Sequence, residues 1–291
     1  MRSRNSRVAA FLYVTPALAF VLAFTVYPFL QLIWMSLHNW SLIAPKRFIG
    51  LNNFAKIWDD AQFWTSLGFT LKYTLWITPI LMILGYLLAL LAASEEPLRK
   101  FMRGVVFLPV VIGLGVSSLL WYWLFSYDFG LVNRALIDLG VIAKPILWFG
   151  ASAHLALWAV IVSIVWKVIG FGMLLFVAAI QGIPSEINEA TMVDGASYWQ
   201  RVRNITLPLT YRTILLVTLL SVIGSLLAFD QFYIMTAGQP FNQTATSVFL
   251  IYLNSFPFLK LVYGAALSLI TAVIILMCTI GQMTLARRSE R

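Results

Sequence analysis

Long apolar runs separated by short polar segments set the pattern of this chain. The runs lie at about 9–36, 66–93, 104–126, 153–180, 208–235 and 261–286. A helix crosses the hydrocarbon core of a membrane with roughly 20 apolar residues, and these runs are too long and too continuously apolar for the alternating strands of a β-barrel. The pattern therefore predicts an all-α membrane protein with six transmembrane helices, forming a single domain over residues 1–291.

Composition and charge agree with this class and orient the chain. Hydrophobic residues make up 61% of the 291 residues and charged residues only 11%, as in multispanning membrane proteins. With the N-terminus inside, more Lys and Arg residues fall in inner segments than in outer ones, so we expect both termini in the cytoplasm. The net charge of +9 predicts attraction to anionic membrane lipid. The basic residues form no patch with interleaved aromatics, so we expect no nucleic-acid partner.

Known catalytic motifs are absent from the sequence. It contains no phosphate-binding GxxxxGK[ST] loop, no HExxH, no GxSxG, and no His and Cys at metal-binding spacing. The single cysteine, Cys278, excludes a disulfide framework. The basic start precedes an apolar run that is too long for a signal peptide, so we expect this run to remain as the first span. The sequence predicts a non-catalytic protein with no metal or cofactor of its own.

A polar segment at 181–208 separates the fourth and fifth apolar runs. Pro184 and the Ser185 hydroxyl predict the start of a helix. Gly195 predicts its end, because glycine adopts a positive φ at low steric cost. A second short helix is predicted next, and Pro208 suits the first turn of the following span. We therefore expect a cytoplasmic helix-turn-helix.

The same segment carries a spaced motif. A glutamate, small residues, a glycine and a final I-x-L-P follow at fixed intervals, at Glu189, Ala190, Asp194, Gly195, Ala196, Ile205, Leu207 and Pro208. This pattern resembles the EAA loop of binding-protein-dependent ABC importer permeases, in their carbohydrate-uptake subfamily of maltose and glycerol-3-phosphate type. Thr191 stands where the third residue of E-A-A is alanine. Further stretches that resemble the subfamily lie at 47–54, 105–111 and 229–240.

The resemblance implies a permease subunit of an ATP-driven sugar or polyol importer in the bacterial cytoplasmic membrane. The polar segment would seat in a cytoplasmic ATPase, with Glu189 facing a basic residue there and Gly195 providing the turn. The implied partners are a second homologous permease in a heterodimer, two ATPase subunits that bind ATP and Mg, an extracytoplasmic solute-binding protein, and a sugar-type substrate. Each permease would enclose half of the path and work by alternating access.

Two other classes of protein remain open from the sequence. A stand-alone secondary transporter or channel predicts inverted repeats or ion-pathway charges within the spans, and no convincing repeat relates 9–126 to 153–286. A membrane enzyme predicts a nucleophile with a base, or a metal cluster, facing a wet cavity. Co-purification separates the classes, because only a permease subunit brings an ATPase with it.

Polar residues inside the spans are the candidates for the substrate path, because such residues are costly in lipid. Ser221 and Ser225 share a face of the fifth span, where the resemblance implies sugar contacts, although serine also bonds back to its own helix. Lys167, with Gly170 shortly after it, needs a carboxylate, backbone carbonyls or water. Asp230 is the carboxylate of the neighbouring span. Structural pairing, an inter-subunit contact and substrate binding are all open for Lys167.

Overall fold

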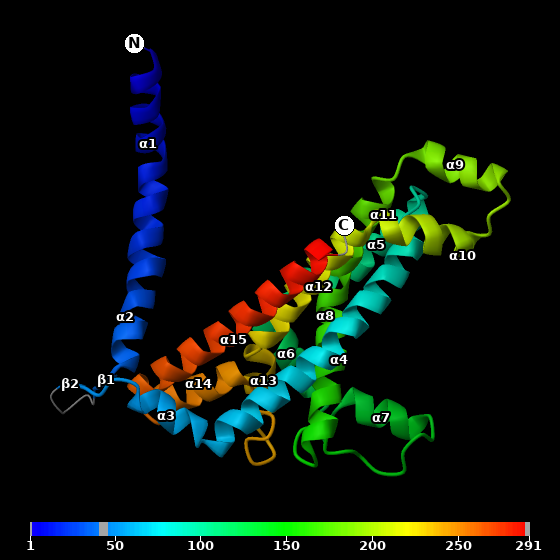
Figure 1. Ribbon diagram of the computed structural model, residues 1–291. Helices are drawn as coiled ribbons and strands as arrows, with labels where there is room; N and C mark the ends of the chain where they lie inside the picture. The colour runs from blue at the N-terminus through cyan, green and yellow to red at the C-terminus, as the bar shows by residue number, and fades with distance from the viewer. Residues whose placement is uncertain (1, 41–45, 289–291) are drawn as a thin grey trace. The chain divides into compact units, whose positions relative to one another are not determined.

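The structure, a computed structural model that describes residues 2–40 and 46–288, is built almost entirely of helices (Figure 1). The first elements are α1 (Arg2–Val21), a π-helical turn (Leu22–Val26), α2 (Tyr27–Ser36), the short strands β1 (His38–Asn39) and β2 (Arg47–Phe48), and α3 (Asn52–Trp58). Next come α4 (Ala61–Ala92), α5 (Pro97–Val111), α6 (Leu114–Leu124), α7 (Leu131–Asp138) and α8 (Ala153–Gln181). The last elements are α9 (Ser185–Val193), α10 (Tyr198–Arg201), a second π-helical turn (Val202–Thr206), α11 (Leu207–Leu209), α12 (Tyr211–Leu226), α13 (Asp230–Met235), α14 (Ser247–Ser255) and α15 (Leu261–Arg288).

The predicted spans correspond to helices of two kinds. Among the described residues, the continuous stretches that are long and apolar enough to cross a membrane are Phe11–Ser36, Ala61–Ala92, Ala153–Gln181 and Leu261–Thr284. Two bent pairs raise their number from 4 to 6 if each pair is one span: Pro97–Val111 with Leu114–Leu124, bent by 96°, and Tyr198–Leu209 with Tyr211–Leu226, bent by 69°. The all-α membrane class is confirmed, and six crossings stay a prediction.

Two of the predicted spans are not continuous helices. The run at 104–126 breaks where Gly113 takes an extended ψ of 143°. The run at 208–235 breaks after α12, and there the Thr246 hydroxyl donates to the carbonyl of Ala228 at 2.6 Å. Ala228 is buried in the connection between α12 and α13, and a buried carbonyl outside a helix needs such a partner. Hydrophobic periodicity does not reveal these breaks, because the residues around them remain apolar.

The contacts divide the chain into two compact units, Met1–Phe63 with Leu250–Ile274 and Trp64–Phe249 with Ile275–Arg291. In the first unit, every side chain from Phe11 to Leu30 is exposed, although this stretch is apolar. Contiguous exposed apolar surface of this size needs lipid or another protein around it. The prediction of a single domain over the whole chain stays a prediction.

The core of the second unit joins α4, α8 and α12. Its buried cluster includes Tyr86, Ala89, Met173, Phe176, Val177 and Val217. Figure 1 shows these helices lying together, with α9 and α10 projecting beyond one end and α7 at the other. Interiors packed in this way have low compressibility and transmit strain. The projecting polar segment is therefore attached to a stiff base.

Candidate functional site

The polar segment contains two helices separated by a tight turn. The helix α9 follows Pro184, which has a ψ of 136°. It ends in a Schellman turn, in which the amide of Ala196 donates to the carbonyl of Thr191 and the amide of Gly195 to that of Met192, both at 3.1 Å. Gly195 has a φ of +75°, which glycine adopts without the clash of a Cβ.

The second helix of the segment begins at a capping box. The Ser197 hydroxyl accepts from the amide of Gln200, whose side chain accepts from the amide of Ser197. The hydroxyl cap expected from Ser185 is wrong, because the N-cap of α9 is Pro184 and this helix has no side-chain cap. Pro208 lies in the first turn of α11, where its missing N–H costs nothing.

The surface of the polar segment combines acidic and large apolar side chains. Of the motif residues, Ala196 and Ile205 are half-buried, and the others are exposed, namely Glu189, Ala190, Asp194, Gly195, Leu207 and Pro208. Val193 is 88% exposed and Trp199 is 65% exposed. Large apolar side chains gathered on a projecting segment mark an interaction site. The segment therefore presents a surface suited to another protein.

The start of the polar segment is tied to the C-terminal end of α4. The Gln181 side chain donates to the carbonyl of Ala93 at 2.9 Å. Arg103 on α5 donates to the carbonyls of Ala92 and Ser94, at 2.7 Å each. The bond to Ala92 satisfies a carbonyl in the last turn of α4, and the other two satisfy carbonyls of the connection that follows this helix. The guanidinium also suits the negative end of the helix dipole.

The far end of the polar segment is tied to α4 as well. Thr210 stands at the 69° bend before α12 and is 1% exposed. Its hydroxyl donates to the carbonyl of Thr206 at 2.7 Å, so the tyrosine must be the donor in its 2.9 Å bond with Tyr86. The Tyr86 ring packs edge-on against Phe176 of α8, with 5.1 Å between ring centroids. The bend is thus joined to both α4 and α8.

Opposite charges gather in the connection between α4 and α5. Lys100 lies 2.8 Å and Arg103 3.5 Å from the Glu95 carboxylate, which also accepts from Gln181. The hydrogen bond and charge of Lys100, with a smaller contribution from Arg103, lower the pKa of Glu95. Because Glu95 is exposed, solvent screens these pairs. They orient the connection more than they stabilise the fold.

The sequence pattern does not predict these anchors. Tyr86, Arg103, Gln181 and Thr210 belong to no motif, and their shared signal is weak: each is a polar or basic side chain near the proposed inner end of an apolar run. Their partners are distant in the chain, with 124 positions between Tyr86 and Thr210. Only the folded chain brings them together.

Lys167 is bound at the break between α5 and α6. Its ammonium donates to the carbonyl of Val110 at 2.9 Å, and the residue is 7% exposed. A backbone carbonyl is one of the partners that the sequence left open for this group. Within the described ranges, no ion pair joins Lys167 to Asp230. The cation also suits the C-terminal end of α5, where the helix dipole is negative.

Gly170 allows α5 and α8 to approach closely. A Cβ at this position would lie 2.3 Å from the carbonyl oxygen of Val106 and 2.8 Å from the Cα of Phe107. Contacts this short with backbone atoms require one helix to shift. Glycine is therefore needed here for packing, one turn along α8 from Lys167.

The other predicted path residues have separate environments. The Ser221 hydroxyl donates to Thr78 of α4 at 3.2 Å, and Ser221 lines a mostly apolar cavity of about 230 Å³. Ser225 is buried and donates to the carbonyl of Val222 on its own helix at 2.9 Å. Asp230 is half-buried in the first turn of α13, where a carboxylate suits the helix dipole. Ser221 therefore differs from Ser225 and Asp230, because its side chain lies beside a cavity.

Comparisons with known proteins agree with this architecture. Residues 82–291 match the family described as binding-protein-dependent transport system inner membrane component. The chain is similar to the trehalose/maltose transport system permease protein MalF of Thermococcus litoralis, with 32% identity over 95% of this chain and 93% of that protein. It is 33% identical to the sulfoquinovosyl glycerol transport system permease protein SmoG of Agrobacterium fabrum, over 98% of this chain and 92% of that one.

A solved structure shares the fold. It is the crystal structure of a bacterial alginate ABC transporter in complex with alginate pentasaccharide-bound periplasmic protein. One of its chains superimposes on this protein with a TM-score of 0.86 and 23% sequence identity, covering 98% of this chain and 96% of that chain. The likeness extends over both compact units of the chain.

Proposed function

We propose, because this chain belongs to the family of binding-protein-dependent transport system inner membrane components, that it forms half of the translocation path for a sugar or polyol. The chain is a non-catalytic permease subunit of a sugar ABC importer. Membership in this family excludes the two alternative classes, a stand-alone secondary transporter or channel and a membrane enzyme. The path alternates between outward and inward access, driven by ATP hydrolysis in a separate subunit.

The polar segment 181–208 is the proposed contact with the cytoplasmic ATPase. The observation that carries this role is its exposed acidic and apolar surface, held at both ends by packed helices. The Glu189 carboxylate pairs with a basic residue of the ATPase, and Val193 and Trp199 provide apolar contact. Gly195 sets the angle between α9 and α10, so that both helices are presented together.

Movement of this segment reaches the membrane helices through the anchors on α4. Shifting an equilibrium from 1:99 to 99:1 needs about 5.5 kcal/mol, whereas one hydrogen bond contributes about 1 kcal/mol. No single anchor is strong enough to transmit that difference. The bonds of Arg103, Gln181 and Tyr86 act together with the buried cluster around Phe176, which moves α4, α8 and α12 as one body.

The assembly that we propose contains four further subunits. They are a second homologous permease, two ATPases that bind ATP and Mg, and an extracytoplasmic solute-binding protein. The exposed apolar stretch from Phe11 to Leu30 supports this arrangement, because lipid and the second permease would cover it. The family is a component of the inner membrane, and we place both termini in the cytoplasm on the basis of the basic residues.

The substrate path within this half is proposed to run past the fifth span. Ser221 is the candidate for direct sugar contact, because its hydroxyl lies beside a cavity. Lys167 and Gly170 maintain the bend and the close packing of the third span. Ser225 and Asp230 shape the neighbouring wall of the path, at the two sides of the break after α12.

The function is tested by co-purification and uptake in the assembled transporter. Glu189→Lys and Gly195→Leu are each expected to reduce recovery of the ATPase with the permease and to reduce sugar import by about tenfold or more, because a charged contact or the turn is lost. Glu186→Lys is the matched control, with the same charge change on an exposed glutamate of α9 that lies outside the motif. Normal ATPase recovery and import in both motif variants would contradict the proposal.

A further inference from the structure

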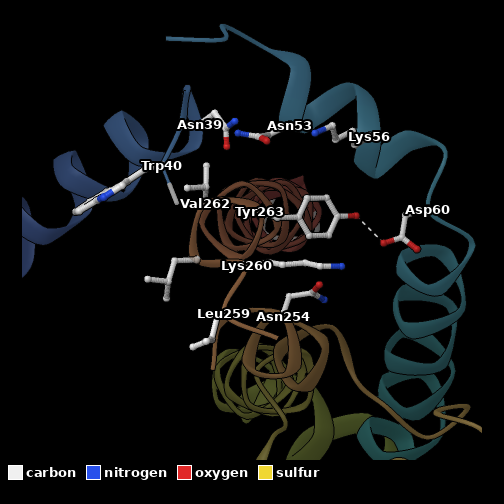
Figure 2. Close-up of a pocket in the computed structure, with 11 residues that line it drawn as sticks. Asn39, Trp40, Asn53, Lys56, Asp60, Asn254, Leu259, Lys260, Val262 and Tyr263 are labelled. Atoms are coloured by element: carbon white, nitrogen blue, oxygen red, sulfur yellow. Dashed lines mark hydrogen bonds between the residues drawn. The ribbon is translucent and has the colours of Figure 1, made fainter. Parts of the chain in front are cut away.

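A polar pocket lies within the unit formed by Met1–Phe63 and Leu250–Ile274. Its volume is about 540 Å³, within the range of small-molecule sites. Figure 2 shows its polar lining, which includes Asn53, Lys56, Asp60, Asn254, Lys260 and Tyr263. None of these residues has a role in the coupling segment or in the path past the fifth span.

The walls of the pocket are fixed by internal hydrogen bonds. The Asn53 side-chain nitrogen donates to the carbonyl of Ser36 at 2.7 Å and to that of His38 at 3.2 Å, which fastens α3 to the end of α2. The Tyr263 hydroxyl donates to the Asp60 carboxylate at 2.5 Å, which fastens α15 to the start of α4. A site whose walls are already held binds with little ordering cost.

Two buried asparagine side chains line the pocket with carboxamide oxygens that have no hydrogen-bond partner within the described part of the chain. Asn53 is 5% exposed and Asn254 is 6% exposed. Both side-chain nitrogens are used, since that of Asn254 donates to the carbonyl of Leu250 at 3.0 Å. Neither Oδ1 atom has a partner among the residues that the structure describes. Each of these oxygens keeps accessible surface, so it can accept a hydrogen bond from a molecule in the pocket.

Donors for a ligand come from the same pocket. Lys56 and Lys260 form no ion pair within the described part of the chain, and an ammonium only donates. Figure 2 shows the Lys260 side chain extending between Tyr263 and Asn254. The pocket therefore offers separate donors and acceptors around one space.

This mixture selects the chemistry of the ligand. A carboxylate or phosphate only accepts and would leave the amide oxygens of Asn53 and Asn254 unpaired. An ammonium ligand only donates, and it would meet the two cations Lys56 and Lys260 against the single carboxylate of Asp60, which already accepts from Tyr263. A hydroxyl both donates and accepts, so a molecule with several hydroxyls satisfies both groups. Leu259 and Val262, which also line the pocket, provide an apolar surface for the C–H face of a sugar ring.

We propose that this pocket is a second saccharide-binding site of the subunit, distinct from the path at Ser221. The inference rests on the proposed function, because a sugar or polyol is the substrate there. With both termini in the cytoplasm, α3 and the connection before α15 lie on the outer side. The site then holds sugar that arrives from outside, before it moves between the membrane helices.

The site is tested in the assembled transporter, reconstituted in lipid nanodiscs without its solute-binding protein. Radiolabelled trehalose, maltose, lactose and sulfoquinovosyl glycerol are the probes, measured by equilibrium binding. Lys260→Met and Asn254→Leu are each expected to weaken binding about tenfold, the effect of losing one hydrogen bond to a charged or buried group. Asn254→Asp, which keeps acceptor oxygens, retains binding. Lys144→Met, a change to an exposed lysine outside the pocket, leaves binding unchanged.

The outcomes separate this site from the function on which it rests. If the complete assembly imports a probe sugar but Lys260→Met and Asn254→Leu change neither binding nor the half-saturating concentration, the site is overturned and the function stands. If these variants weaken only the affinity for the solute-binding protein, the pocket is a protein contact and the saccharide site is overturned. If the complete assembly imports none of the probes, both the proposed sugar function and the proposed saccharide site are overturned.

Discussion

The break between α5 and α6 and the polar segment between α8 and α12 both interrupt apolar helices, but they treat their polar groups in opposite ways. At the break, Lys167 is buried and bound to the Val110 carbonyl, and Gly170 lies against the backbone of α5. In the polar segment, Glu189 and Trp199 are exposed, and the anchors described above lie at its two ends. An interruption that serves the fold satisfies its groups within the chain, whereas one that serves a partner leaves them outside.

The strongest test of this comparison is Gly170→Ala. We expect the free energy of unfolding to fall by about 1–3 kcal/mol, because the new Cβ would meet the Val106 carbonyl and force α5 away from α8. Thermal unfolding of the purified permease in detergent measures this loss. Gly224→Ala is the matched control, since a Cβ there meets no described atom within 4 Å. Equal stability of the two variants would show that the break is not tightly packed.

Lys167→Met tests whether Lys167 stabilises the fold or takes part in the substrate path. We expect the free energy of unfolding to fall by about 1–2 kcal/mol, because the Val110 carbonyl loses its partner. Sugar import should fall while ATPase attachment stays normal, since the polar segment is untouched. The control is Lys72→Met, on an exposed lysine of α4. Unchanged import together with unchanged stability would remove Lys167 from both roles.

Tyr86→Phe tests the hydrogen bond that joins the far end of the polar segment to α4. The variant loses the hydrogen bond to Thr210 but keeps the ring contact with Phe176, so we expect a loss of only about 1 kcal/mol. The expected functional effect is a lower ratio of sugar imported to ATP hydrolysed, because the bend is held less firmly to α4. Uptake and phosphate release from the same proteoliposomes measure this ratio. Tyr13→Phe, at an 86% exposed position, should leave the ratio as it is.

The smallest expected effect concerns pH at Glu95. Its pKa is lowered in the folded protein, chiefly by Lys100, so ionised Glu95 contributes stability above the ordinary glutamate pKa of about 4.3. That contribution is lost as the pH falls from this value through the lower pKa of the folded state. Thermal unfolding of the wild type and of Glu95→Gln is measured across this pH range. The difference in stability between the two proteins isolates Glu95, because the other carboxylates contribute equally to both. A stability advantage of the wild type over Glu95→Gln that grows as the pH falls would contradict this prediction.

The sequence predicts the membrane class and the polar segment from local rules. Apolar runs of span length need no knowledge of neighbours, because lipid imposes their helical form. The prediction of a turn at Gly195 likewise depends on a positive φ that glycine tolerates. The expected cap from Ser185 is wrong because a similar hydroxyl is used at Ser197 instead, and local rules do not choose between neighbouring candidates.

The amino-acid sequence is sufficient to predict apolar helices of span length and a polar, turn-containing segment between the fourth and fifth runs. Only in the folded chain does Lys167 bind a backbone carbonyl, Tyr86 contact Thr210, and Asn53 line one pocket with Asn254. The two kinds of feature differ in the distance along the chain over which their interactions act. Hydropathy and turn preferences act between neighbours in the chain, whereas a hydrogen bond between distant residues exists only after packing has brought them together.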